Sequence, residues 1–125
     1  MTVDFRSVVP ILRIFDVTKA DEFYVGYLGF GVDWDHRFDE TAPLYRQISR
    51  HGLTLHLSEH HGDGSPGVQI RVVMRGLDAL HGELEAKKYR YMRPGIETGP
   101  APGSREMVVV DPFGNQIRFC EEAQE

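Results

Sequence analysis

The chain has 125 residues, of which 41% are hydrophobic and 26% charged, and this size and balance are typical of one globular domain. A formal net charge of −5 disfavours nucleic acid and anionic membranes as partners, and no apolar run approaches the roughly 20 residues that cross a bilayer. The single cysteine, Cys120, excludes an internal disulfide. With no apolar leader segment, these features favour a cytoplasmic protein whose partners are small molecules.

The first half of the chain begins with a β-branched, apolar segment. Residues Ser7 to Phe15 predict a strand, although Pro10 removes one backbone donor and therefore marks an edge, a bulge or a crossing point. The apolar period then changes to that of an amphipathic helix, with Thr18 as its N-cap and Gly29 as its end. The buried stripe of this helix is expected to contain Ala20, Phe23, Tyr24, Tyr27 and Leu28.

Three strands are expected after this helix. From Phe30 to Asp39 apolar and polar residues alternate strictly, which places Trp34 and Phe38 on the same strand face as Phe30, Val32 and His36. Two further strands, near Leu44 to Ser49 and Leu53 to Glu59, are joined by a short turn. The order of this half is therefore β-α-β-β-β.

The second half repeats this order after a Gly-rich loop from His60 to Gly67. Its helix is expected to bury Leu77, Leu80, His81 and Leu84. Its strands are expected at Val68 to Met74, Met107 to Val110 and Gln116 to Cys120, with a weaker candidate at Tyr89 to Pro94. The two halves match at offsets of 58 in the first strand, 60 in the helix and 62 in the last strand.

The repeat predicts the fold class. We expect one α+β domain over residues 1–125, built from two βαβββ modules at about residues 5–60 and 67–122. A module of this size rarely folds alone, so the two must share a surface. Two curved sheets arranged in this way enclose a cleft, which is a common place for a small-molecule site.

Several short motifs resemble those of one known superfamily. They are Ser-Val-Val-Pro-Ile-Leu from Ser7, Glu22-Phe-Tyr, Leu28-Gly-Phe, Arg75-Gly-Leu-Asp-Ala-Leu, Gly103-Ser-Arg-Glu and the turn Asp111-Pro-Phe-Gly-Asn115. From about Ser7 to Glu122 the sequence resembles the vicinal oxygen chelate superfamily of glyoxalases, bleomycin-resistance proteins and dioxygenases, and it is most similar to the bleomycin-resistance proteins. Because the superfamily contains both enzymes and binding proteins, the resemblance alone leaves the function open.

The resemblance assigns four positions to metal ligands in the enzymes of the superfamily. In this chain they are Val9, His56, Gln69 and Arg118. Val9 has no donor atom and Arg118 is a permanent cation, so we expect no cofactor and lean against an enzyme. His56 and Gln69 are the remaining candidate ligands for a divalent metal such as zinc or nickel. The loop with His60, His61 and Asp63 is a further candidate, although its side chains are not expected to converge.

The resemblance also points to binding residues. Trp34 stands where the resistance proteins place a stacking aromatic, with Phe38 close by, and Arg71 occupies a position where those proteins have another aromatic. Together with Arg118, Arg71 would make part of the cleft cationic, which suits a carboxylate, phosphate or phenolate. The expected ligand-binding set is Trp34, Phe38, His56, Gln69, Arg71 and Arg118. The alternatives are that Trp34 is a core anchor and that Arg118 forms a salt bridge to Glu106 or to another strand neighbour.

The last expectation concerns Pro10. In the resistance proteins a proline here lies where the N-terminal strand crosses to a partner chain, so the resemblance implies a strand-swapped homodimer with two clefts. The leading hypothesis is a metal-free homodimer that sequesters an aromatic or glycopeptide antibiotic-like molecule. The alternatives are a glyoxalase-like metal-dependent lyase or isomerase, a metal-free catalyst with His56 as general base, and a vestigial cleft in a dimer that serves a partner protein.

Overall fold

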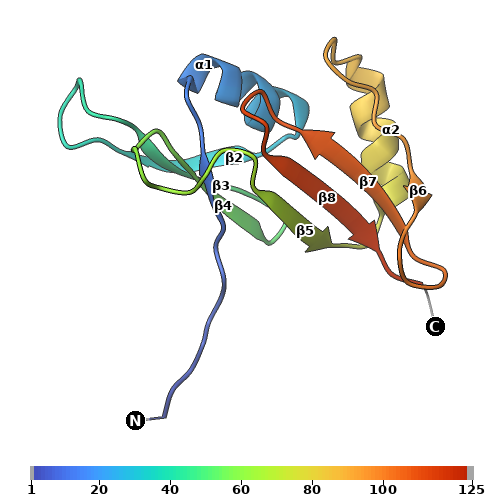
Figure 1. Ribbon diagram of the computed structural model, residues 1–125. Helices are drawn as coiled ribbons and strands as arrows, with labels where there is room; N and C mark the ends of the chain where they lie inside the picture. Colours follow the sequence, from blue (N-terminus) through green and yellow to red (C-terminus); the bar gives the residue numbers. More distant parts are fainter. Residues whose placement is uncertain (1, 124–125) are drawn as a thin grey trace.

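The computed structural model describes residues 2–123, which form two modules with the predicted order of elements (Figure 1). The first module contains β1 (Ile11–Arg13), α1 (Val17–Ala20), η1 (Asp21–Tyr27), β2 (Gly31–His36), β3 (Tyr45–Arg50) and β4 (Leu53–Ser58). The second contains β5 (Gln69–Val73), α2 (Leu77–Lys87), β6 (Glu97–Thr98), β7 (Arg105–Val110) and β8 (Gln116–Glu121). Within these residues no helix is long and apolar enough to cross a membrane.

Each module forms a four-stranded mixed sheet, and the two sheets have the same topology. Their strand orders are β1-β4-β3-β2 and β5-β8-β7-β6, and in each the first strand runs parallel to the last. This equivalence confirms the α+β fold of two βαβββ modules. His56 and Arg118 are equivalent at the offset of 62 residues that relates the last strands. Ile11 lies opposite His56 and Arg71 lies opposite Arg118, so Ile11 and Arg71 are equivalent and the first strands are related by an offset of 60 residues. The offset of 58 expected for this strand is wrong.

The first helix confirms the predicted buried stripe but begins with another cap. Asp16 is the N-cap, and its carboxylate accepts the backbone N–H of Lys19 at 2.9 Å, so the assignment of Thr18 as the cap is wrong. After α1 the helix widens into the π-helical segment η1. It ends before Gly29, whose φ of +77° is readily adopted by glycine.

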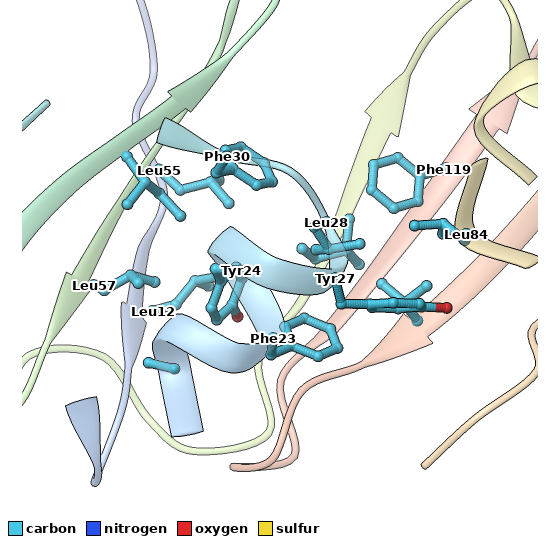
Figure 2. Close-up of a cluster of buried hydrophobic side chains, with 14 of the residues drawn as sticks. Leu12, Phe23, Tyr24, Tyr27, Leu28, Phe30, Leu55, Leu57, Leu84 and Phe119 are labelled. Atoms are coloured by element: carbon cyan, nitrogen blue, oxygen red, sulfur yellow. The ribbon is translucent and has the colours of Figure 1, made fainter. Parts of the chain in front are cut away.

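The core lies between the helices and one face of each sheet (Figure 2). Phe23 and Tyr24 of η1 pack in it with Leu55 and Leu57 of β4. Its buried side chains from the second module include Leu84 of α2 and Phe119 of β8, and Leu28 and Phe30, which follow η1, lie between the two groups (Figure 2). One continuous core therefore joins the modules, as expected for units too small to fold alone.

Three expected strands differ from the structure. β1 has only three residues, and residues 2–9 run away from the sheets (Figure 1). The side chains of Val3, Phe5 and Val8 are exposed. The segment Tyr89 to Pro94 is no strand, and the short strand of this region is β6. β2 ends at His36 and contains a bulge, which interrupts the strict alternation expected from Phe30 onward.

Candidate functional site

The bulge in β2 decides where Trp34 lies. Val32 pairs with Ile48, whose side chain is in the core, whereas Trp34 pairs with Gln47 on the opposite face. Trp34 therefore does not share a face with Val32, and with 43% of its surface exposed it is no core anchor. We call the face that carries Trp34, Tyr45, Gln47 and His56 the open face of the first sheet.

The side chains of this open face form one connected group. The Trp34 and Tyr45 rings are stacked at an interplanar angle of 14° with centroids 6.1 Å apart, and His56 stands edge-on to Trp34 at 5.3 Å. Nε2 of His56 lies 3.0 Å from the side-chain oxygen of Gln47, so this nitrogen carries the hydrogen. Nδ1 then accepts the hydroxyl hydrogen of Tyr45 at 2.6 Å. Burial, with a contribution from Asp63, raises the pKa of Tyr45, and the hydroxyl stays protonated.

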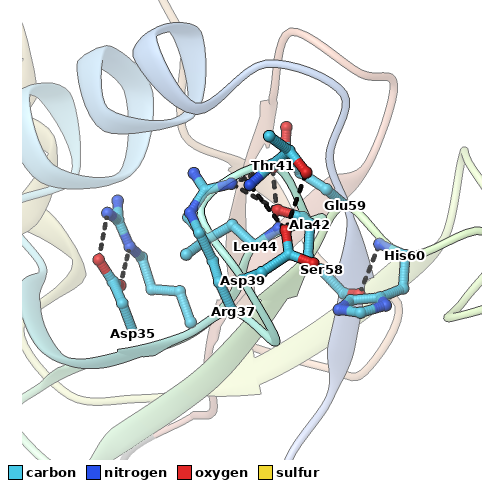
Figure 3. Close-up of polar contacts among 10 residues, drawn as sticks. Asp35, Arg37, Asp39, Thr41, Ala42, Leu44, Ser58, Glu59 and His60 are labelled. Atoms are coloured by element: carbon cyan, nitrogen blue, oxygen red, sulfur yellow. Dashed lines mark hydrogen bonds and ion pairs between the residues drawn. The ribbon is translucent and has the colours of Figure 1, made fainter.

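Phe38 lies beside this group on the loop between β2 and β3. The loop is fixed by polar contacts: Asp39 accepts the backbone N–H and hydroxyl of Thr41, and Arg37 donates to the carbonyl of Ala42 (Figure 3). The Phe38 ring is 79% exposed and stands edge-on to His60 and to His36. It therefore extends the aromatic surface at the edge of the first sheet.

The open face of the second sheet is charged. It carries Gln69, Arg71, Arg118, Glu106 and Cys120. Glu106 is 8% exposed and accepts hydrogen bonds from Arg118 at 2.5 Å and from Arg71 at 3.4 Å. The salt bridge between Arg118 and Glu106 is thus confirmed. Cys120 is buried in β8, and burial raises the pKa of its thiol, so it is a poor nucleophile.

The structure brings the predicted ligand-binding residues together in two separate groups. Trp34, Phe38 and His56 belong to the first sheet and Gln69, Arg71 and Arg118 to the second. The hydrogen bonds and aromatic contacts described above stay within one sheet each. Two cavities of about 500 and 340 Å³ elsewhere in the chain are lined by neither group.

Gln47 was missing from the sequence-based set of site residues. It pairs with Trp34 and bonds His56. A period-2 signal could have found it, since Tyr45 and Gln47 stand two residues apart on one strand. Asp35, in the same strand as Trp34, lies on the helix-covered face, where it pairs with the buried Arg46. The hydrogen bond from Arg46 lowers the pKa of Asp35.

The residues at the four metal positions of the superfamily do not fit a metal ion. Both ring nitrogens of His56 are occupied by Tyr45 and Gln47. The oxygen of Gln69 faces the guanidinium of Arg118 at 3.4 Å, and a permanent cation beside this oxygen would repel a second one. Among residues 2–123 no three His, Cys, Asp or Glu side chains converge, the loop with His60 and His61 included. The residues at these positions therefore do not form a ligand set for a metal ion.

The comparison with known families agrees with this architecture. The family model of a glyoxalase superfamily protein matches residues 1–125, and the chain therefore belongs to the glyoxalase superfamily. A search of curated protein sequences gave no match.

Solved structures with the same fold include binding proteins and an enzyme. A bleomycin-binding protein from bleomycin-producing Streptomyces verticillus, solved with copper(II)-bleomycin, is 29% identical, with a TM-score of 0.66 over 99% of this chain and 100% of that chain. A glyoxalase-related enzyme from Clostridium phytofermentans is 24% identical, with a TM-score of 0.74 over 96% and 97%. An antibiotic binding protein from Streptomyces sp. CB03234 is 21% identical, with a TM-score of 0.64 over 94% and 98%. Because the same fold occurs in binding proteins and in enzymes, the function of this chain must be inferred from its site residues.

Proposed function

We propose that this chain is a metal-free binding protein for a planar aromatic molecule of the antibiotic type. The observation that carries the proposal is the half-exposed indole of Trp34, which stacks on Tyr45 on the open face of the first sheet. A large aromatic held in place on a strand and left open to solvent is suited to stack on a flat ligand. Each such contact contributes about 1–3 kcal/mol of binding free energy, so Trp34 and Phe38 together supply the aromatic part of a site.

The open face of the second sheet supplies the polar part. Glu106 neutralises one of the two guanidinium groups of Arg71 and Arg118, and Arg71 remains about half exposed. A guanidinium in this position donates to carboxylate, phenolate or carbonyl oxygens of a ligand. The bleomycin-binding relative is a protein of the same fold that was solved with copper(II)-bleomycin, and this supports a ligand of the antibiotic type.

The two faces would complete one cleft in a homodimer, with the first sheet of one copy opposite the second sheet of its partner. Pro10 supports this arrangement, because its carbonyl accepts the N–H of His56, whereas the preceding residues 2–9 run away from the sheets (Figure 1). Among residues 2–9, the side chains of Val3, Phe5 and Val8 are more than 80% exposed. Three apolar side chains in solvent on an extended segment are characteristic of a strand that pairs with another chain.

The edge of β4 supports the same arrangement from the other side. In the second sheet the N–H of Gln116 donates to the carbonyl of Val68. The equivalent residue of the first sheet is Thr54, but β1 pairs with β4 only from Ile11 onward. The start of β4 therefore has an open edge, and residues 2–9 have no strand partner within the described chain. An exchange of residues 2–9 between two copies would give a strand partner both to these residues and to the open edge of β4.

The ligand proposal is tested by fluorescence, because Trp34 is the single tryptophan of the chain. Titration with bleomycin and with a panel of aromatic acids should give saturable quenching by at least one of them. Calorimetry on Trp34→Ala should then show a 10- to 100-fold weaker affinity, which corresponds to the loss of about 1–3 kcal/mol. Tyr91→Ala, which removes an exposed aromatic elsewhere, is the control and should bind normally.

The proposal is wrong if no ligand of the panel quenches Trp34. It is also wrong if purified protein contains stoichiometric zinc or nickel and acts on a hemithioacetal, since that result would favour the lyase or isomerase alternative.

A mixing experiment tests the shared cleft. Trp34→Ala removes the indole of the aromatic face and Arg71→Ala removes the half-exposed guanidinium of the charged face, so each variant alone should bind at least tenfold more weakly. In a mixed dimer one cleft loses both groups and the other keeps both, and binding should return when the two variants are mixed. A cleft within one chain would give no recovery. Light scattering at micromolar concentration should give the mass of a dimer, and deletion of residues 2–9 should lower it to that of a monomer.

A further inference from the structure

A groove lies where the turn between β3 and β4 meets the start of α2. Its volume of about 500 Å³ is within the usual range of roughly 300–1,000 Å³ for ligand pockets. Its apolar lining comes from both modules and includes Leu28, Phe30, Leu53, Val72, Met74 and Leu80. Trp34, His56, Arg71 and Arg118 are not among the residues that line it.

The internal repeat explains why this groove is open. The equivalent junction lies between the turn that joins β7 to β8 and the start of α1, and this turn closes it. The Phe113 ring packs against that of Phe15 with centroids 6.0 Å apart, and the Asn115 side chain donates to the carbonyl of Arg13. The turn between β3 and β4 consists of His51 and Gly52 alone. With the offset of 62 residues that relates the last strands, His51 takes the place of Phe113, but its ring is exposed and makes no aromatic contact with another described residue.

The residue equivalent to Phe15 is a cation. With the offset of 60 residues that relates α1 to α2, Phe15 corresponds to Arg75. Arg75 lines the groove, is exposed, and makes no hydrogen bond or salt bridge within residues 2–123. The carboxylate of Glu83 also lines the groove, but both of its oxygens are bonded to Arg50 at 2.8 Å. The free charge at the mouth is therefore positive.

We propose that this groove binds a small amphipathic organic anion. Its apolar body would lie against Leu53, Met74 and Leu80, in the space that an aromatic turn residue fills at the other junction. Its anionic group would pair with the guanidinium of Arg75. This site is independent of the cleft proposed above, because it lies within one chain and uses none of the same residues.

The test uses decanoate as the probe and amide chemical shifts of the full chain as the measurement. Decanoate should shift the amides of Gly52, Arg75 and Gly76 saturably, and decyltrimethylammonium should bind at least tenfold more weakly. Arg75→Glu should weaken decanoate binding at least tenfold. Arg90→Glu makes the same charge change at an exposed residue that does not line the groove, and it should leave the affinity unchanged.

Ala79→Phe, at an exposed residue of α2 that lines the groove, should abolish decanoate binding by filling the space. Trp34→Ala should leave decanoate binding unchanged, so that failure of this site and failure of the cleft are distinguishable. The proposal is overturned if the shifts do not saturate, if the cationic probe binds equally well, or if Arg75→Glu has no effect. It is also overturned if Ala79→Phe converts a dimer to a monomer, because the groove would then be covered by a second copy.

Discussion

The turn between β7 and β8 spans Asp111–Asn115, whereas the turn between β3 and β4 consists of His51 and Gly52. The longer turn reaches across to the first module, where the hydroxyl of Tyr24 donates to Asp111 at 2.6 Å in a buried setting. At the shorter turn the modules are joined by the ion pair of Arg50 with Glu83, which is partly exposed. Two modules of equal topology are thus joined once by buried hydrogen bonds and once by a surface ion pair beside a groove.

The largest expected effect concerns the closed junction. Asp111 accepts hydrogen bonds from Tyr24, from the backbone of Phe113, and from the backbone and side chain of Asn115. Asp111→Ala would leave these buried donors without a partner, and we expect it to lower the free energy of unfolding by about 4 kcal/mol. Urea unfolding measures this change. Tyr24→Phe removes one donor and should cost only about 1–2 kcal/mol; equal losses would show that Asp111 acts through Tyr24 alone.

The second prediction compares the two open faces. Arg118→Ala would leave the buried carboxylate of Glu106 with the longer contact to Arg71 alone, at an expected cost of about 3 kcal/mol. His56→Ala in the first sheet exposes Tyr45 and Gln47 to water, and it should cost about 1 kcal/mol. Thermal unfolding of both variants checks the order. The double variant Arg118→Ala with Glu106→Ala should recover part of the loss, and its failure to do so would contradict the charge argument.

The third prediction concerns pH at the open junction. The hydrogen bond from Arg50 holds the pKa of Glu83 below its ordinary value, so the folded state favours the ionised carboxylate. Its contribution to stability is present above about pH 4.3 and is lost as the pH falls through the lower pKa of the folded state. After allowance for solvent screening we expect about 1 kcal/mol.

Unfolding by urea between about pH 5 and 2 measures this effect. Glu83→Gln should make stability depend less on pH over this interval. Glu85→Gln removes the same charge from the same helix without the contact to Arg50 and is the control. An unchanged pH dependence in Glu83→Gln would show that this ion pair does not join the modules.

The smallest effect is expected at the short turn. His51 adopts a φ of +44°, which costs a β-carbon residue some strain, and Gly52 follows it at +90°. Asn-Gly is the preferred sequence for such a two-residue turn, so His51→Asn should stabilise the protein by roughly 0.5 kcal/mol. Differential scanning calorimetry should show a slightly higher melting temperature, and a lower one would mean that the His51 ring makes a favourable contact.

Much of the fold could be predicted from residue order. The stripe with Phe23, Tyr24 and Leu28 predicted the first helix, and the repeat predicted two modules, because periodicity records directly which side chains are buried. The bulge in β2 could not be predicted, because it arises from the pairing of β2 with β3 and the sequence of β2 alone contains no signal for the extra residue. The same holds for the length of β1: Ser7 to Phe15 has strand propensity throughout, but β4 offers a partner only from Ile11 onward.

Of the candidate site, the sequence by itself identified the residue types, among them Val9 and Arg118, whose side chains lack the donor chemistry of a metal ligand wherever they lie. It also determined the superfamily through the repeat and the Asp111–Asn115 turn. Only the tertiary structure decided that Trp34 faces solvent beside His56, that Arg118 is bound to Glu106, and that these groups lie on separate sheets. The physical reason is that strand pairing and the packing of helices on the sheets join residues distant in sequence, and these contacts decide which face of each strand stays open.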